Sequence, residues 1–366
     1  MKNAHLAGPL LIILSTGAFA QSSVTLYGVI DSNVRYLTNA SSTGNSLVEM
    51  GTGGMSESEV GIRGVEDIGQ GVSAIFRIEN RFFSGSGQSD PALPFWNTAF
   101  VGLRSATLGQ LTLGRQTNTL VDTVTKVYAS NPWIPYSNSF QPELTMTAGI
   151  WTSNLAKYAI RLGSLTGEAS YAFGGDAGHT SYGSQMAFGL GWLPGGPVSL
   201  AAAYSAIRDS TNGSLAKLWT AGGSYTWDAT QFHAGYYENR LDPGFSSYLN
   251  GPFTQEELMA LKYLDFSSRR MMTAGITQTV STTWHFSLNY WRTWQSGKTT
   301  DLDGTASQFQ LVADYSLSRR TDVYLEGDYS LYRGDLIGAQ LQGANALGSA
   351  VKSTQLGLAA GVRHQF

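Results

Sequence analysis

The feature that most constrains this chain is a strict alternation of side chains in its last segment. Leu356, Leu358 and Val362 fall on one face of an extended chain, and Gln355 and Arg363 fall on the other. A period of two is the period of a β-strand with one apolar and one polar face. The segment is therefore predicted to be a strand between an apolar and an aqueous environment.

The same alternation recurs along the chain in about sixteen segments. They are residues 23–37, 58–65, 72–83, 96–104, 109–116, 153–162, 166–174, 184–193, 197–207, 216–227, 230–239, 269–279, 283–294, 306–317, 321–333 and 353–366. An even number of segments of roughly ten residues is typical of transmembrane barrels. Closure matters because an open sheet in lipid would leave edge N–H and C=O groups unpaired. We predict an all-β, transmembrane antiparallel β-barrel of 16 strands.

The connections alternate between short and long. Residues 163–165 and 280–282 are short, whereas 38–57, 117–152 and 240–268 are long, as is a fourth gap at 334–352. Transmembrane barrels alternate tight periplasmic turns with long external loops in this way. With that assignment, both termini lie on the periplasmic side. A soluble β-sandwich also alternates, but it does not explain the rhythm or a face rich in Tyr and Trp.

The N-terminus has the pattern of a secretory signal. Lys2 precedes an apolar stretch at 6–14, and Ala18-Phe19-Ala20 forms a small-residue cleavage site. The apolar stretch is far shorter than the ~20 residues that a spanning helix needs. We expect residues 1–20 to be a signal peptide and 21–366 to form the barrel.

Composition excludes several classes of protein. Charged residues make up only 13% and aromatic residues 12%, and cysteine is absent, so disulfides cannot stabilise the exported chain. A formal net charge of −3 argues against a nucleic-acid partner, which calls for a basic surface.

Six short motifs together resemble the general porins of Gram-negative bacteria, of the β-proteobacterial type. They are SVTLYGVID at 23–31, GIRGVEDIG at 61–69, AFVGL at 99–103, LGRQ at 113–116, DYSLSRRT at 314–321 and the terminal RHQF at 363–366. Each motif is short, but their order and spacing span residues 23 to 366.

The resemblance implies an outer-membrane homotrimer that lets small hydrophilic solutes and ions diffuse passively through a water-filled pore. It implies contact with outer-membrane lipid and lipopolysaccharide, and no cofactor, metal or catalytic residue. It also implies that the third external loop folds inward and narrows the pore.

Residues 117–152 correspond to that loop, which is long enough to be functional rather than a plain turn. Asp122 and Glu143 are its candidate acids at the pore constriction, and Tyr128, Trp133 and Tyr136 give it an aromatic character. In the resembled family, such an acidic loop faces arginines on the barrel wall, and charged rings of this kind tune selectivity.

The candidate basic wall comprises Arg115, Arg77, Arg81, Lys157 and Arg161. Arg115 matches a wall arginine of the family. Simple alternation would place it on the same face as the apolar Leu111 and Leu113, so we expect a bulge or a loop-covered wall there.

Two positions depart from the family pattern. Glu59 and Trp151 stand where the family usually has arginines. We therefore hypothesise a constriction that is less basic than the family norm and more tolerant of cations or aromatic solutes.

Two alternatives remain open. One is a substrate-selective channel whose aromatic third loop binds a particular nutrient. The other is an outer-membrane enzyme or adhesin, for which His285, Ser287 and Asn289 provide a weak signal because they share one strand face. A water-facing row on a strand explains these three residues more simply, and no nucleotide-binding fingerprint or zinc-ligand spacing is present.

Overall fold

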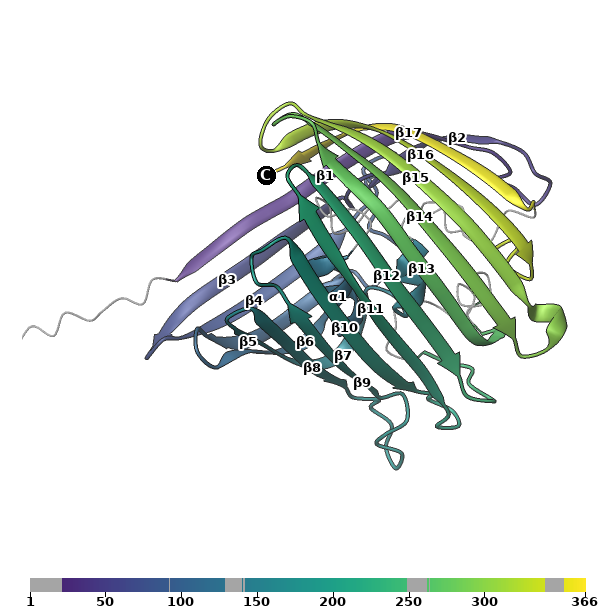
Figure 1. Ribbon diagram of the computed structural model, residues 1–366. Coiled ribbons are helices and arrows are strands. Elements are labelled where there is room, and N and C mark those ends of the chain that lie inside the picture. The colour runs from purple at the N-terminus through teal and green to yellow at the C-terminus, as the bar shows by residue number, and fades with distance from the viewer. Residues whose placement is uncertain are drawn as a thin grey trace, which may run out of the picture.

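The computed structural model describes residues 22–91, 93–128, 140, 142–248, 262, 264–339 and 352–366, and its strands form one closed antiparallel sheet (Figure 1). The strands are β1 (Ser23–Leu37), β2 (Leu47–Thr52), β3 (Glu59–Gly69), β4 (Val72–Arg81), β5 (Thr98–Ser105), β6 (Gly109–Thr117), β7 (Trp151–Leu162), β8 (Leu165–Ala172), β9 (Gln185–Trp192), β10 (Val198–Arg208), β11 (Leu215–Trp227), β12 (Thr230–Leu241), β13 (Phe266–Thr279), β14 (Trp284–Gly297), β15 (Gly304–Ser316), β16 (Thr321–Gly334) and β17 (Thr354–Gln365). Helix α1 (Thr119–Val127) and the 3-10 turns η1 (Pro142–Met146) and η2 (Thr300–Leu302) complete the elements. Within these residues, no helix has the length and hydrophobicity to cross a membrane.

The barrel has 16 wall strands, as predicted, although the sheet contains one further strand segment. Strands β2 and β3 both pair with β1, β2 along residues 32–37 and β3 along residues 23–29, so together they occupy one position in the wall. The prediction of an unbroken loop at 38–57 was therefore wrong. Strand β2 is too short for its alternation to stand out from the loop around it.

The sheet closes between its first and last strands. Residues 29–37 of β1 pair with residues 357–365 of β17. At the seam, the Gly28 amide donates to the Phe366 carbonyl at 3.1 Å and the Phe366 amide donates back to Gly28 at 3.0 Å. These bonds pair the edges of the two strands, which is the condition for a stable barrel in lipid.

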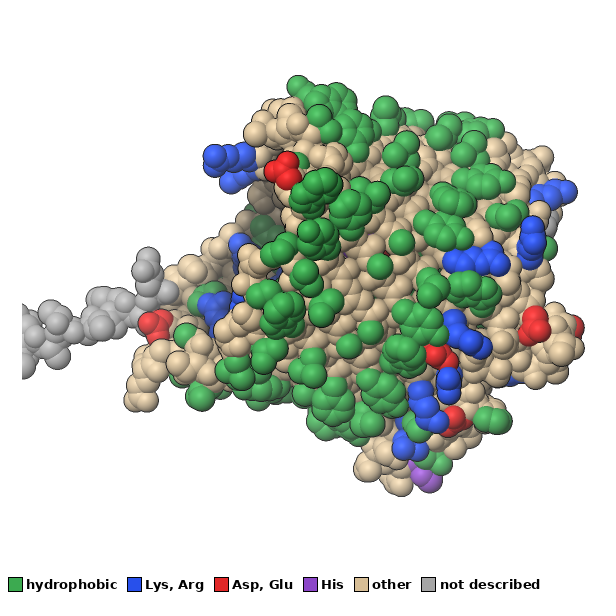
Figure 2. All heavy atoms as spheres, viewed as in Figure 1, with side chains coloured by type: hydrophobic (Ala, Val, Ile, Leu, Met, Phe, Trp, Pro, Cys, Tyr) green, Lys and Arg blue, Asp and Glu red, His purple; other side chains and the backbone are tan. Residues whose placement is uncertain are grey.

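The two faces of the wall differ as the alternation predicted. On β1 the side chains of Val24 and Leu26 are 68% and 63% exposed on the outer face. Gln310 and Asp328, on the inward-facing rows, are buried. Figure 2 shows hydrophobic side chains spread over the outer wall, with Lys and Arg side chains toward its two ends.

The third long loop folds into the barrel, as expected. Its helix α1 begins at Asn118, whose side-chain oxygen accepts a hydrogen bond from the Val121 amide at 2.9 Å. This N-cap satisfies one of the free amides of the first turn. Leu120 and Val124 are fully buried because α1 packs against the inner faces of β9, β10 and β11.

Candidate functional site

Helix α1 is fixed to one side of the inner wall. The hydroxyl groups of Tyr128 and Thr220 lie 2.7 Å apart, and Thr119 contacts Ser170 in the same way at 2.9 Å. The Tyr128 ring lies against Gly222, where a Cβ atom would come within 2.7 Å of the ring. The glycine therefore provides the space that lets the loop approach the wall.

The returning arm of the loop is fixed to a different part of the wall. The indole N–H of Trp291, on β14, donates to the carboxylate of Glu143 at 2.5 Å, and Phe140 packs edge-on against the same indole ring with centroids 5.6 Å apart. Gln310, on β15, donates to the Phe140 carbonyl at 3.0 Å. The described parts of the loop thus attach to the barrel on both sides of the lumen.

A cavity of about 600 Å³ lies between α1 and the inner wall near β3, β4 and β7, and we call it the constriction cavity after the predicted constriction residues in its lining. Five predicted site residues line it, namely Glu59, Arg77, Asp122, Trp151 and Lys157. They come from β3, β4, α1 and β7, so residues nearly a hundred positions apart in the sequence share one wall of the lumen.

Asp122 and Lys157 join the loop to the wall. The Lys157 ammonium donates to the Asp122 carboxylate at 2.5 Å and to the Thr117 carbonyl at 2.9 Å. The Thr117 hydroxyl donates to the other oxygen of Asp122 at 2.8 Å. Burial raises the pKa of Asp122, but the nearby ammonium groups of Lys157 and Lys126 outweigh it and the net pKa is lowered. Asp122 is thus kept ionised beside the pore.

The arginines of β4 are also paired with carboxylates. Arg77 bonds to Glu79, and its Nε donates to the Tyr27 hydroxyl at 2.8 Å. Arg81 bonds to Glu57, and its guanidinium lies 5.3 Å from the centre of the Trp151 ring. Trp151, which stands where the family usually has a cation, therefore stabilises a neighbouring cation through its ring.

Arg115 is one of three predicted wall residues that do not line the cavity, together with Arg81 and Arg161. The expected irregularity beside it is present, because the register of β6 against β7 shifts between Gly114 and Gln116. The Arg115 guanidinium nevertheless bonds to the Asn97 carbonyl at 3.1 Å and the Ser153 hydroxyl at 2.6 Å, rather than facing the constriction cavity.

Arg161 is exposed at the turn between β7 and β8, where its Nε donates to the Gly163 carbonyl at 3.1 Å. The prediction that Arg161 lies at the constriction was wrong. On β7 it lies four residues closer than Lys157 to the short turn between β7 and β8. Glu143 belongs to the loop, as predicted, but it is buried against Trp291 and is not among the residues that line the cavity.

The sequence reasoning missed three charged residues of the cavity, Glu57, Glu79 and Arg363. Glu79 and Arg363 could have been found, because both alternate onto the polar rows of their strands. Glu57 could not, because it lies in the short segment between β2 and β3, which has no periodicity.

The aromatic and histidine alternatives receive little support from the described residues. Tyr128 is buried against the wall, while Trp133 and Tyr136 lie outside the described residues. His285 lies 3.4 Å from the Thr279 hydroxyl, and the Asn289 amide donates to Gln310 at 3.2 Å. These contacts are those of a polar row on the inner wall.

Comparison with known proteins agrees with this architecture. Residues 7–335 match the family model described as Gram-negative porin. The chain is 29% identical to outer membrane porin protein 32 of Delftia acidovorans and 27% identical to an outer membrane porin protein of Bordetella pertussis, with 100% of each chain covered.

Among solved structures, an anion-selective porin from Comamonas acidovorans matches with a TM-score of 0.73 at 23% identity, covering 94% of this chain and 100% of that one. The trimer form of OmpT from Vibrio cholerae matches with a TM-score of 0.67 at 16% identity, covering 94% of this chain and 99% of that one. The family model covers most of the chain, and the barrel has the matching fold. The chain therefore belongs to the Gram-negative porin family and is a channel of the outer membrane.

Proposed function

We propose that small hydrophilic solutes and ions diffuse passively through the constriction cavity, and that this constriction does not select strongly for anions. The observation that carries the proposal is the charge of the lining. Its carboxylates are Glu57, Glu59, Glu79 and Asp122, and its cations are Arg77, Lys157 and Arg363.

The cations of the lining are already neutralised by partners. Lys157 pairs with Asp122, Arg77 with Glu79, and Arg363 with Asp322 at 2.8 Å. Glu59 makes no ion pair or side-chain hydrogen bond with any residue that the structure describes. With its three cations paired to carboxylates, the described lining offers little free positive charge to attract anions, whereas selective channels use unpaired charged rings.

The test is the reversal potential across a planar bilayer in a salt gradient. We expect wild type to show weak cation preference, and Glu59→Arg to shift the permeability ratio several-fold toward anions. A unit charge about 4 Å from a permeant ion contributes on the order of 1 kcal/mol or more, depending on the local dielectric. Arg161→Gln, at the mouth, is the control and should change the ratio little. Clear anion selectivity of the wild type would overturn the proposal.

We propose that the channel is a homotrimer in contact with outer-membrane lipid and lipopolysaccharide, that it has no enzymatic activity, and that residues 1–20 are removed as a signal peptide. The trimer form of OmpT supports the assembly by analogy of fold. The exposed apolar side chains of Val24, Leu26, Val101 and Leu103 provide an outer surface suited to lipid or to a neighbouring subunit. Residues 1–20 lie outside the described residues, so mass spectrometry of the N-terminus tests the cleavage before Gln21.

A further inference from the structure

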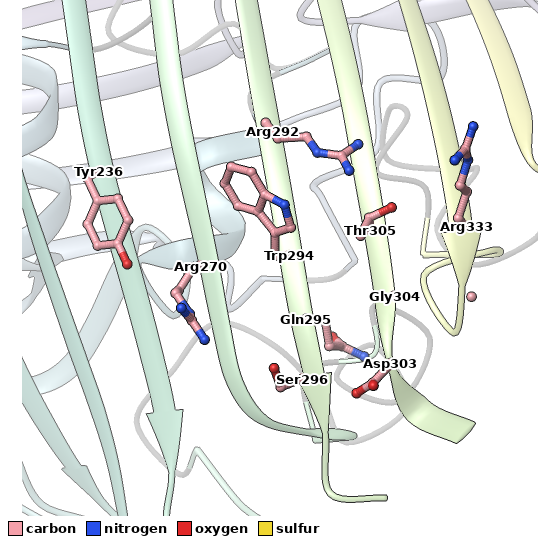
Figure 3. Close-up of a pocket in the computed structure, with 11 residues that line it drawn as sticks. Tyr236, Arg270, Arg292, Trp294, Gln295, Ser296, Asp303, Gly304, Thr305 and Arg333 are labelled. Carbon is pink, nitrogen blue, oxygen red and sulfur yellow. The ribbon is translucent and has the colours of Figure 1, made fainter. Parts of the chain in front are cut away.

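Three arginines lie on the outer face of the barrel, on three of the four consecutive strands β13 to β16 (Figure 3). Arg270 lies on β13, Arg292 on β14 and Arg333 on β16, each close to the end of the strand that carries a long loop. Together with Trp294, Ser296 and Thr305 they line a shallow, open depression of about 840 Å³, which we call the arginine patch. Arg270 and Arg292 share the outer face with the exposed side chains of Met272 and Trp294.

The arginine patch carries more positive than negative charge, with three arginines and one aspartate in its lining. Arg270 and Arg333 make no ion pair or hydrogen bond within the described part of the chain. Arg292 donates only to the neutral Ser307 hydroxyl, at 2.6 Å, and lies over the Trp294 ring. Asp303 also lines the depression, and one of its oxygens accepts the Gly297 amide at 2.8 Å.

Neighbouring cations on the same outer face behave differently. Arg240 pairs with Glu238 at 2.6 Å, and Lys217 pairs with Asp242 at 2.8 Å. The free guanidinium groups are therefore a property of the patch and not of this end of the barrel as a whole.

The position of the arginine patch along the barrel wall indicates which layer of the membrane it faces. Tyr236 and Trp294 lie in its lining, and such aromatic side chains are enriched at membrane–water interfaces. Below it the outer face is apolar, with Met272, Tyr290 and Phe309 exposed. Lipid-facing arginines are costly at the middle of a bilayer and cost little near its interfaces. Since the long loops are external, the patch faces the headgroup layer of the outer leaflet.

We infer that the arginine patch binds phosphate groups on the headgroup of an anionic glycolipid of the outer leaflet. A guanidinium group offers paired N–H donors that match phosphate oxygens, and such charge-assisted bonds are stronger than neutral ones. The hydroxyls of Ser296 and Thr305 can donate to further oxygens, and the apolar wall below accommodates acyl chains. The inference rests on the membrane orientation and the lipopolysaccharide contact proposed above.

The test measures lipid binding to the full-length mature protein in detergent. The probes are bisphosphorylated lipid A and the same lipid with its phosphates removed, and binding is followed by native mass spectrometry. We expect Arg270→Gln/Arg333→Gln to weaken binding of the phosphorylated lipid by about tenfold or more, given the usual strength of charge-assisted bonds. The matched control is Arg319→Gln/Arg320→Gln, which removes two exposed arginines from the turn before β16 and should bind like wild type.

Other outcomes would overturn the inference. Equal affinity of both double variants, or equal binding of the dephosphorylated lipid, would show that the patch does not recognise phosphate. Competition by millimolar inorganic phosphate with no preference for lipid would indicate a free-anion site. A change of oligomeric state in the patch variant without lipid would indicate a contact between copies. Single-channel conductance of the same variants should stay at the wild-type value, so a failure here is distinguishable from a failure of the channel proposal.

Discussion

Single carboxylates hold together parts of this barrel that are far apart in the sequence. The Asp31 carboxylate accepts the Tyr324 hydroxyl at 2.6 Å and the Met55 amide at 2.8 Å, and Asp328 accepts Arg35 at 2.6 Å. Each contact joins β1 to a distant segment. Because loss of one partner would leave the other polar group buried without its bond, these contacts hold distant parts of the wall together.

Asp209 has the same role among the external loops. It follows β10, and it accepts the Thr211 amide at 2.7 Å and the Ser246 amide at 2.6 Å from the loop after β12. Burial raises the pKa of Asp209, but hydrogen bonds from Thr211 and Ser246 outweigh it and lower the pKa to about 2. Because the folded pKa is lowered, the stabilisation is present above the ordinary value near 3.8 and is lost as the pH falls toward 2.

We predict that Asp209→Asn loosens the contact between these two loops. At pH 6, amide hydrogen exchange around Ser246 should be about tenfold faster than in wild type, and the difference should shrink between pH 4 and pH 2. Mass spectrometry of peptides covering residues 242–248 measures this effect. Asp228→Asn, in a short turn at the opposite end, is the control. Identical exchange of wild type and Asp209→Asn at pH 6 would contradict the assigned role.

At the scale of elements, the third loop is held on both sides of the lumen. We predict that Trp291→Phe frees its returning arm, because phenylalanine keeps the packing against Phe140 but loses the N–H that donates to Glu143. A hydrogen bond to a charged group contributes about 1.5–3 kcal/mol. Brief closures in single-channel recordings should become several-fold more frequent, with little change in the thermal midpoint of the barrel.

Trp219→Phe is the control for that experiment, since Trp219 is exposed on the outer wall. If brief closures of the Trp291→Phe channel are no more frequent than those of wild type, the Glu143 contact does not restrain the loop.

The strands themselves were largely predictable, because alternation along a wall between lipid and water is a local property of the sequence. Strand β2 was missed because it is short and continues another strand in the wall. The inward fold of the third loop was predicted from the family resemblance alone. No pattern within residues 117–152 indicates that α1 packs inside a barrel.

At the scale of the molecule, the barrel depends on its closure. A Cβ atom on Gly28 would come within 2.6 Å of the Glu59 carbonyl and 2.4 Å of the Phe366 ring. We predict that Gly28→Ala destabilises closure by about 1–3 kcal/mol, as overpacking usually does. The folded fraction after refolding, read from heat-modifiable migration in gels, should fall.

Gly196→Ala is the matched control, because no atom lies within 4 Å of a Cβ at that position. Equal folded yields for the two variants would contradict the importance of the tight contact at the seam.

The constriction was only partly predictable. Glu59, Arg77, Asp122, Trp151 and Lys157 meet in one cavity, as the polar rows and the resemblance suggested. Arg161 was misplaced because alternation tells which face a residue occupies and not how deep it lies. Glu143 was recognised as a loop acid, but its partner Trp291 is 148 residues away, and no local pattern links them.

The most direct test of an open trimeric channel is single-channel recording of the refolded mature protein in a planar bilayer. We expect stepwise insertions that close in three equal sublevels, with a reversal potential that shows no strong anion preference. A correctly folded barrel that conducts no ions would contradict the central claim that this chain forms an open channel.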